Sequence, residues 1–358
     1  MKKSLVAVAL LGAFAGSSMA ADVTLYGKID TGLNYQHVTK NGTSTDTLQM
    51  KTGQSAGNRF GLKGTEDLGN GVKVGFILEN GFDADTGVLK AYSGQDATLF
   101  GREASLNVTS DFGKLTFGRT GALSSGLTST DSIAGYMAFG TGYGSNTSEI
   151  GHFGIGDRTR MNNTATYQTP RFAGVRVSAQ YSFQMQGQEG TEQSKNKRYA
   201  GLGVDYTNGA FAAGLVVDTI INPTTADNTE DSLGVTLGAS YDFEVAKLFG
   251  IAGYGQNENK FGKLAAAGTE GVKGYWGQLG VTAPVAGGKV LASVSYSDSE
   301  DEQNSDIDMK AWGVGAGYQY SLSKRTSLYA FAGYNQMKAN DTKKTYETEV
   351  GFGLCHSF

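Results

Sequence analysis

The side chains that most often carry catalysis are few in this sequence and lie far apart. Its three histidines are His37, His152 and His356, and its single cysteine is Cys355. A serine nucleophile needs a histidine base within hydrogen-bond reach, and a zinc site needs several ligands close together. Residues so widely scattered assemble neither arrangement. We therefore expect no catalytic residues, no metal site, no cofactor and no enzyme.

Two other patterns could carry chemistry. The glycine-rich stretch at 313–317 faintly resembles a dinucleotide-binding loop, but it lies inside an alternating strand pattern with no helix after it. Basic side chains are more informative. Lys28 lies on the polar phase of its segment, and Arg59 is out of phase with Phe60 and Leu62. Both should therefore point to the polar side of a strand.

The composition narrows the class of protein. Glycine accounts for 53 of 358 residues and tyrosine and phenylalanine for 18 each, with only 3 prolines. This is typical of many strands joined by turns, and collagen is excluded by the lack of proline and of a glycine period. One cysteine rules out a disulfide scaffold. A net charge of −4 gives no overall basic field for nucleic acid.

The N-terminus has the layout of a secretory signal peptide. Lys2 and Lys3 precede an apolar run over residues 5–15, and Ser18 and Ala20 supply small side chains before a cleavage point. The run is too short for a membrane-spanning helix. We expect residues 1–20 to be removed during export and residues 21–358 to form one domain.

Period-two alternation recurs along that domain, as in 233–243 and 312–320, and no helical period of useful length appears. We expect sixteen strands, near 22–37, 48–65, 71–82, 98–109, 113–119, 158–169, 173–185, 197–206, 209–218, 231–242, 246–256, 271–282, 288–298, 307–320, 326–337 and 345–358. Connections alternate between short turns and long polar links, the latter including 38–47, 186–196, 219–230 and 298–306. The pattern predicts an all-β, transmembrane, 16-stranded antiparallel β-barrel with short periplasmic turns and long extracellular loops.

The C-terminal segment supports closure of that barrel. Val350, Phe352, Leu354, His356 and Phe358 occupy alternate positions, and the sequence ends on the aromatic residue. A last strand of this kind should pair with the first and remove the open edges. It is similar to the terminal assembly signal of outer-membrane barrels, with Phe358 as the closing aromatic.

Three segments resemble the Gram-negative general porins, with the closest likeness to the betaproteobacterial branch. They are Val23–Asp30, Asn58–Gly71 and Phe112–Arg119. The resemblance implies an outer-membrane homotrimer in contact with lipid and lipopolysaccharide, in which each barrel lets small hydrophilic solutes and ions diffuse passively. It also implies a long third loop that folds into the lumen. Nucleic acid is not an expected partner.

The connection near 120–157 is the candidate for this constriction loop. It spans almost forty residues, and a loop of that length is normally functional or disordered. Its modest polarity and several aromatics favour packing against an inner wall. The acids within it before Asp157 are Asp131 and Glu149, which are candidates for the constriction by location only.

The resemblance places four basic residues on the pore wall opposite the loop: Lys28, Arg59, Arg119 and Arg160. Weaker candidates are Arg102 and Arg158. Arg119 shares its phase with Leu115 and Phe117, so it must lie where its strand ends. An acid-poor loop facing a basic wall would create a transverse field and favour anions weakly, despite the negative net charge.

Several alternatives stay open. A substrate-specific channel and a barrel that serves adhesion or surface recognition both fit the same strand pattern. The acidic run over 298–308 is either solvated surface or a divalent-cation site that bridges lipopolysaccharide. Cys355 stands where the porin family usually carries a basic residue, so a positive charge in the lumen is missing there; a small neutral filler is the expected role.

Overall fold

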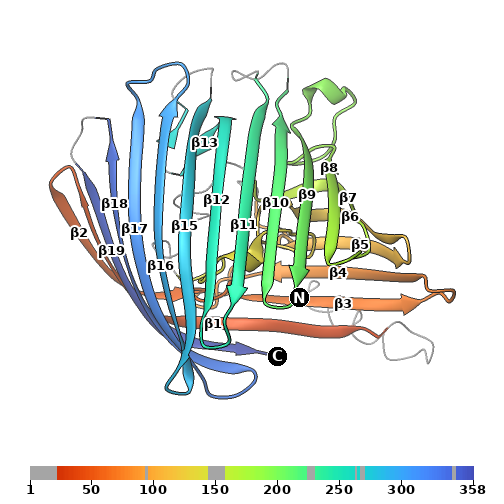
Figure 1. Cartoon of the computed structure of the whole chain (residues 1–358), viewed down its shortest axis with the longest axis horizontal. Helices are drawn as coiled ribbons and strands as arrows, with labels where there is room; N and C mark the ends of the chain where they lie inside the picture. Colours follow the sequence, from red (N-terminus) through yellow and green to blue (C-terminus); the bar gives the residue numbers. More distant parts are fainter. Residues whose placement is uncertain are drawn as a thin grey trace, which may run out of the picture.

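The chain forms a closed barrel of antiparallel strands (Figure 1). The computed structural model describes residues 22–92, 96–143, 158–223, 230–262, 264–266, 271–340 and 344–358. The expected signal peptide therefore lies outside the described residues. The barrel strands are β1 (Thr24–Lys40), β2 (Thr43–Thr52), β3 (Arg59–Asp67), β4 (Lys73–Gly81), β5 (Glu103–Ser110), β6 (Gly113–Gly121), β7 (Arg160–Gln168), β8 (Val175–Ser182), β9 (Arg198–Asn208), β10 (Phe211–Ile221), β11 (Ser232–Asp242), β12 (Lys247–Glu258), β15 (Val272–Val285), β16 (Gly288–Asp301), β17 (Asp308–Ser321), β18 (Thr326–Ala339) and β19 (Thr345–Ser357).

These segments form a barrel of sixteen strands, because β2 and β3 together occupy the position of one strand. β1 pairs with β2 through its upper half and with β3 through Thr24–Lys28. The ring closes where β1 pairs with β19, from Lys28 opposite Ser357 to Thr39 opposite Tyr346. Phe358 extends that closure, because its backbone exchanges two hydrogen bonds with Gly27 at 3.0 and 3.1 Å. The predicted fold class is confirmed.

Apolar side chains lie on the outside of the barrel and polar ones on the inside. In β11, Leu237 is 56% exposed, whereas Thr236 and Ser240 are buried. The same alternation runs through β6, where Phe117 is exposed and Thr116 is buried. A soluble sandwich would bury its apolar faces against each other. This inverted partition is instead that of a barrel whose outer surface faces lipid.

Apart from the two-residue turn between β1 and β2, the longer connections lie at one rim of the barrel and the short turns at the other. Strands β9 to β18 stand upright in Figure 1 with their long connections at the upper edge, and β3 and β4 cross behind them on the opposite wall. Such crossing reflects the strand tilt of a closed barrel. Three minor elements lie in the connections: the 3-10 helices η1 (Ala134–Tyr136) and η2 (Gln193–Lys195), and the hairpin of β13 (Lys260–Phe261) and β14 (Leu264–Ala265).

One predicted connection is wrong. The sequence pattern predicts a long link over residues 38–47, but β1 and β2 pair up to Lys40 opposite Thr43. Asn41 and Gly42 make the turn, with φ values of 54° and 84°. An Asn-Gly pair accepts positive φ at both positions and therefore suits a two-residue hairpin, which lets polar strands continue above the barrel wall.

No helix in the described part of the chain is long and apolar enough to cross a membrane.

Candidate functional site

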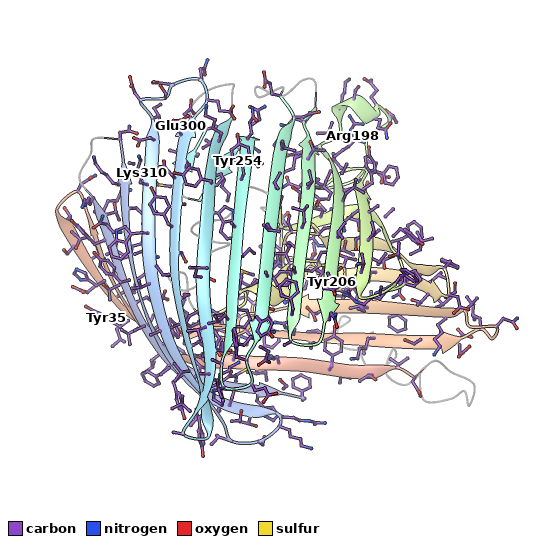
Figure 2. All side chains as sticks on the ribbon, in the orientation of Figure 1. Tyr35, Arg198, Tyr206, Tyr254, Glu300 and Lys310 are labelled. Carbon is purple, nitrogen blue, oxygen red and sulfur yellow. The ribbon has the colours of Figure 1, made fainter. Side chains whose placement is uncertain are left out.

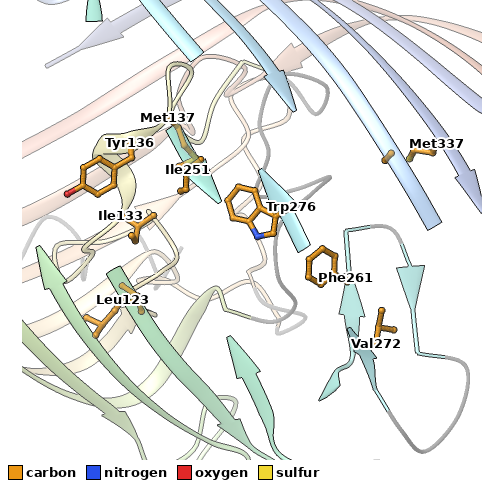
Figure 3. Packing of buried hydrophobic residues seen from close by; sticks show 11 residues of the cluster. Leu123, Ile133, Tyr136, Met137, Ile251, Phe261, Val272, Trp276 and Met337 are labelled. Carbon is orange, nitrogen blue, oxygen red and sulfur yellow. The ribbon is translucent and has the colours of Figure 1, made fainter. Parts of the chain in front are cut away.

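The long connection after β6 enters the barrel. We call residues 122–159 the inner loop, of which 122–143 and 158–159 are described. Its buried side chains Ile133, Tyr136 and Met137 pack against Ile251 and Trp276 of the barrel wall (Figure 3). Further along, a second cluster joins loop residues to β16, β18 and β19: Ala138, Phe139, Tyr143, Leu291, Tyr329, Phe331 and Cys355. The described part of the loop thus follows the inner wall from β10 round to β19.

Glycines on the inner wall make room for this path. They stand on five strands, at Gly203, Gly214, Gly238, Gly280 and Gly317. A Cβ added at Gly238 would lie 2.5 Å from Cδ2 of Tyr136, and one at Gly280 would lie 2.6 Å from Cβ of Ala138. Real Cβ atoms do not approach so closely. We call these five residues the glycine track, because each allows the loop to lie directly against the wall.

Polar contacts fasten the first part of the loop. Glu103, buried at the start of β5, accepts hydrogen bonds from the backbone nitrogen of Ser129 at 3.1 Å and from its hydroxyl at 2.5 Å. Ser124 donates to Asp218 of β10 at 2.7 Å. The loop is thereby tied to two separate walls of the barrel before it reaches the glycine track.

Asp218 belongs to a buried ionic network that includes Arg158. The Arg158 guanidinium bonds Asp218 and makes two 2.6 Å contacts with the Glu258 carboxylate, and Tyr199 donates to Asp218 at 2.9 Å. All three charged side chains are almost fully buried. Arg158, a weaker pore candidate, is therefore placed inside the wall that supports the loop.

The far end of the described loop meets the break between β2 and β3. We call residues 53–58 the bulge segment. Buried Asp30 holds it, since its carboxylate accepts from the backbone nitrogens of Ser55 at 2.8 Å and Ala56 at 2.7 Å and from the Tyr329 hydroxyl at 2.5 Å. The backbone nitrogen of Tyr143 in turn donates to the Gln54 carbonyl. The bulge segment thus supports the far end of the described loop.

The opposite wall carries a concentration of positive charge. Four arginines, which we call the arginine cluster, surround Tyr92 of the connection between β4 and β5: Arg59, Arg102, Arg119 and Arg160. The Tyr92 ring lies 4.6 Å from the Arg160 guanidinium and 5.8 Å from that of Arg102, and its hydroxyl accepts from Arg102 at 3.3 Å. Arg59 lies opposite Gly81 in the β3–β4 ladder and Arg119 donates to the Gly101 carbonyl, and both glycines lie directly against Tyr92.

One carboxylate is built into the arginine cluster. Glu79 of β4 accepts from Nε of Arg102 at 2.5 Å and from the Tyr26 hydroxyl at 3.0 Å, and it lies 4.0 Å from Nη1 of Arg59. Glu79 thus contacts two of the four guanidinium groups, those of Arg102 and Arg59. The concentration of four positive charges in the cluster would attract anions that pass beside it.

The cluster members differ in their access to water. Arg59 is 26% exposed, whereas Arg102 and Arg160 are buried. Arg160 donates to the carbonyls of Arg102 at 3.0 Å and Leu127 at 3.5 Å, so it lies between two connections. Within the basic set expected from sequence, Arg59 thus reaches water while Arg160 holds the surrounding loops.

Arg119 and Lys28 extend the basic wall in two directions. The register between β6 and β7 shifts between Gly118 and Thr120. This shift lies near the end of β6, where the phase of Arg119 in the sequence predicts that the strand ends. Arg119 there donates to the Gly101 carbonyl at 2.9 Å and to Asn162. Lys28 lies opposite Arg59 in the β1–β3 ladder. It also lines a polar cavity of about 280 Å³ beneath the bulge segment.

The two predicted loop acids have different outcomes. Asp131 accepts from the backbone nitrogens of Gly126 at 2.7 Å and Ile133 at 3.1 Å, so it shapes its own loop. Glu149 lies outside the described residues. Burial raises the pKa of Tyr136 and of Tyr143 to about 12, so both loop hydroxyls stay neutral near pH 7. The described loop therefore adds little negative charge opposite the arginine cluster.

Sequence reasoning missed several of these residues. Tyr92, Glu79 and Asp30 gave no local signal, because their importance depends on neighbours from other strands. The glycine track could have been sought as glycines on the inward phase of successive strands. Cys355 lies in the aromatic cluster around Tyr329, consistent with a small neutral filler. Within the described ranges, no group of three His, Cys, Asp or Glu side chains could hold a metal ion.

Comparisons with known proteins agree with this geometry. The sequence profile of the Gram-negative porin family matches residues 7–340. An outer membrane porin of Bordetella pertussis is 34% identical and outer membrane porin protein 32 of Delftia acidovorans is 32% identical, each over the whole of both chains. The solved anion-selective porin from Comamonas acidovorans has a TM-score of 0.73 at 28% identity, covering 95% of this chain and all of that one.

The two relatives extend over the full length of the present chain, the solved porin shares its barrel, and the family profile spans nearly all of the chain. The features found above, an outward apolar surface and a loop lying inside, are what a water-filled passage through a membrane requires. The chain belongs to the Gram-negative porin family.

Proposed function

We propose that this outer-membrane porin admits small hydrophilic solutes by passive diffusion and favours anions at its narrowest section. The barrel size supports diffusion, because about sixteen strands leave an aqueous channel whereas about eight do not. The described part of the inner loop narrows that channel, because its buried side chains pack along the inner wall. The single observation that carries the anion preference is the concentration of four guanidinium groups around Tyr92 in the arginine cluster.

The charge distribution across the lumen supports this selectivity. Arg59 and Lys28 present basic groups on one side, and the described inner loop presents Asp131, whose carboxylate is engaged by its own backbone. A transverse field of this kind attracts anions and orders water. The similar porin from Comamonas acidovorans is itself anion-selective, which makes the same preference reasonable here.

Planar-bilayer recording tests the proposal in two steps. The purified protein should give discrete conductance steps with a roughly linear current–voltage relation. Under a potassium chloride gradient, its reversal potential should have the sign of chloride permeation. Absence of conductance would overturn the diffusion role, and a reversal potential of the opposite sign would overturn the anion preference alone.

Three finer points belong to the same proposal. We propose a homotrimer, supported by the similarity to porins, one of which, OmpT of Vibrio cholerae, has a solved trimer form. We also propose contact with lipopolysaccharide in the outer leaflet. Finally, we propose that the protein carries no catalytic activity, because its relatives are channels and its function requires only a passage.

A further inference from the structure

The polar cavity beneath the bulge segment lies at the rim of the barrel that carries the short turns. Figure 2 shows both rims: Arg198 and Glu300 lie near the upper one, and Tyr206 lies near the lower end of β9. The turn between β17 and β18 lies at the lower rim (Figure 1). We call this cavity the rim cavity. Its volume is about 280 Å³, and its lining includes basic and hydroxyl residues: Lys28, Ser321, Lys324, Arg325, Ser327 and Ser357.

Three cations line the rim cavity. Lys28 is half-buried on β1, opposite Arg59 of the arginine cluster, and Lys324 and Arg325 are exposed in the turn between β17 and β18. Within the described part of the chain, none of the three is in an ion pair, and no described lining residue is an aspartate or a glutamate. Asp30 lies behind the bulge segment, where its carboxylate already accepts three hydrogen bonds. The rim cavity therefore keeps its positive charge for a ligand.

Hydroxyl groups from neighbouring strands complete the lining. Ser357 of β19 lies opposite Lys28, and Ser327 of β18 lies opposite Ser321 of β17. The side-chain amide of Gln319 donates to the Ser327 hydroxyl at 3.2 Å. A serine hydroxyl that accepts one hydrogen bond still has its own hydrogen to donate. The lining thus combines cations with hydroxyl donors, which are the groups that bind an anion through its oxygen atoms.

The turn that carries Lys324 and Arg325 is held in one conformation. The Ser323 hydroxyl accepts from the backbone nitrogens of Arg325 at 3.2 Å and of Thr326 at 3.1 Å. The carbonyl of Arg325 accepts from the backbone nitrogen of Ser357 at 2.8 Å, which ties the turn to β19. Because the backbone is already ordered, less conformational freedom is lost when a ligand binds.

A second polar cavity at the lower rim has a different charge balance. Its lining includes the cations Arg171, Arg176 and Lys247, but also the carboxylates of Asp131 and Asp205. Asp205 contacts both arginines. Those positive charges are therefore largely neutralised within the protein. The rim cavity, whose described lining contains cations and no carboxylate side chain, is the better anion site of the two.

We propose that the rim cavity binds a small, doubly charged oxyanion of the phosphate type. The Arg325 guanidinium contacts two of its oxygens, the ammonium groups of Lys28 and Lys324 contribute charge, and the serine hydroxyls donate to the remaining oxygens. The site rests on the proposed function, because it adjoins the passage that anions take beside the arginine cluster. It deepens that function by naming a class of anion and a second place where the anion is held.

Phosphorus NMR tests the site with inorganic phosphate and the full-length protein in a phosphorus-free detergent, at constant chloride concentration. Wild-type protein should show saturable binding, and Lys324→Gln/Arg325→Gln should lower the affinity of the tightest phosphate site roughly tenfold. The control Lys73→Gln/Lys247→Gln removes two charges at the same rim but outside the cavity lining, and it should bind as wild type. Absence of saturable binding in wild type, or equal losses in the two variants, would overturn the site.

Two further measurements distinguish a built site from a generally basic rim. Ser327→Ala keeps every charge but removes a hydroxyl donor, and it should lower phosphate affinity roughly threefold. Nitrate carries a single charge and should compete roughly tenfold more weakly than phosphate. Equal competition by nitrate, together with unchanged affinity in Ser327→Ala, would reduce the cavity to a region of positive potential and overturn the proposal.

The same experiment separates the rim cavity from the arginine cluster. Loss of phosphate binding in Arg59→Gln, with Lys324→Gln/Arg325→Gln unaffected, would place the anion at the cluster and overturn the site. Bilayer recording of wild-type protein in potassium chloride tests the proposed diffusion and anion preference without phosphate. Failure of the proposed function would therefore appear in the recordings, and failure of the rim cavity would appear in the binding data.

Discussion

The two sides of the lumen are built from different materials. From β9 to β19, the wall offers glycines and aromatic rings, and the inner loop lies directly on it. From β1 to β7, the wall offers arginines around Tyr92 and stays in contact with water at Arg59. We therefore expect one wall to fix the size of the passage through packing and the other to set its charge.

Each side is also stabilised differently. The loop-bearing wall contains a fully buried ionic network and a glycine track, both of which depend on close geometry. The basic wall contains like charges that would repel one another, and Glu79 and Tyr92 hold them together. Substitutions on the first wall should therefore affect stability and pore size, and those on the second should affect selectivity.

The largest effect is expected at Arg158. Replacement by methionine removes the buried guanidinium that both the Asp218 and Glu258 carboxylates contact, so the free energy of unfolding should fall by roughly 3–5 kcal/mol. Urea titration of the protein in phospholipid vesicles measures this. Arg171→Met is the matched control, because Arg171 is partly exposed and Asp205 keeps its 2.8 Å contact with Arg176. Equal losses in the two variants would contradict a special role for the buried network.

Next in size is a change of pore width from the glycine track. Gly238→Val places side-chain atoms where Tyr136 lies and should push the inner loop into the passage, lowering single-channel conductance by roughly half. Gly250→Val is the control, because its added Cβ would approach no described atom closer than 3.5 Å. If both variants conduct like wild type, the track does not determine the loop's position.

A smaller effect, confined to selectivity, is expected from the basic wall. Arg59→Gln removes a charge in contact with water and should lower the ratio of anion to cation permeability roughly twofold, with little change in stability. Reversal potentials in a salt gradient measure the ratio. Lys195→Gln removes an exposed charge from η2 and should leave it unchanged. An unchanged ratio in Arg59→Gln would place the selective section elsewhere.

The smallest effect concerns the bulge segment, which supports the inner loop. Tyr329→Phe removes one of the hydrogen bonds to Asp30 and should cost about 0.5–1.5 kcal/mol of unfolding free energy. The bulge segment should also hold the loop less firmly, so the channel should close at lower applied voltage. Tyr320→Phe, on the outer face, is the control for loss of a tyrosine hydroxyl. Identical voltage thresholds in the two variants would contradict the view that the bulge segment supports the loop.

The sequence predicted the architecture well because a barrel strand is a local pattern. Alternation over 233–243 or 312–320 needs only neighbouring residues, and the expected strand limits there agree closely with β11 and β17. The error at 38–47 has a local cause as well, since a polar run suggests a loop although Asn41 and Gly42 indicate a tight hairpin. The interruption between β2 and β3 gave no comparable signal.

The candidate site was predictable only in part. Phase alone placed Lys28 and Arg59 on the inner face, and the expected strand end at Arg119 coincides with a register shift. The burial of Arg102, Arg158 and Arg160 could not be inferred from the sequence, because it depends on neighbours that come from distant segments. Their assignment to the constriction stays a prediction that selectivity measurements must test.

Residue types and their period thus determined by themselves that this chain forms a closed barrel with its apolar side outward, since each strand carries its own two faces. Only the tertiary structure decided which inward residues meet the loop, which meet water and which neutralise each other. Those outcomes depend on register across the whole ring, where a glycine opposite Tyr136 or a carboxylate beside Arg158 is supplied by a strand far away in sequence.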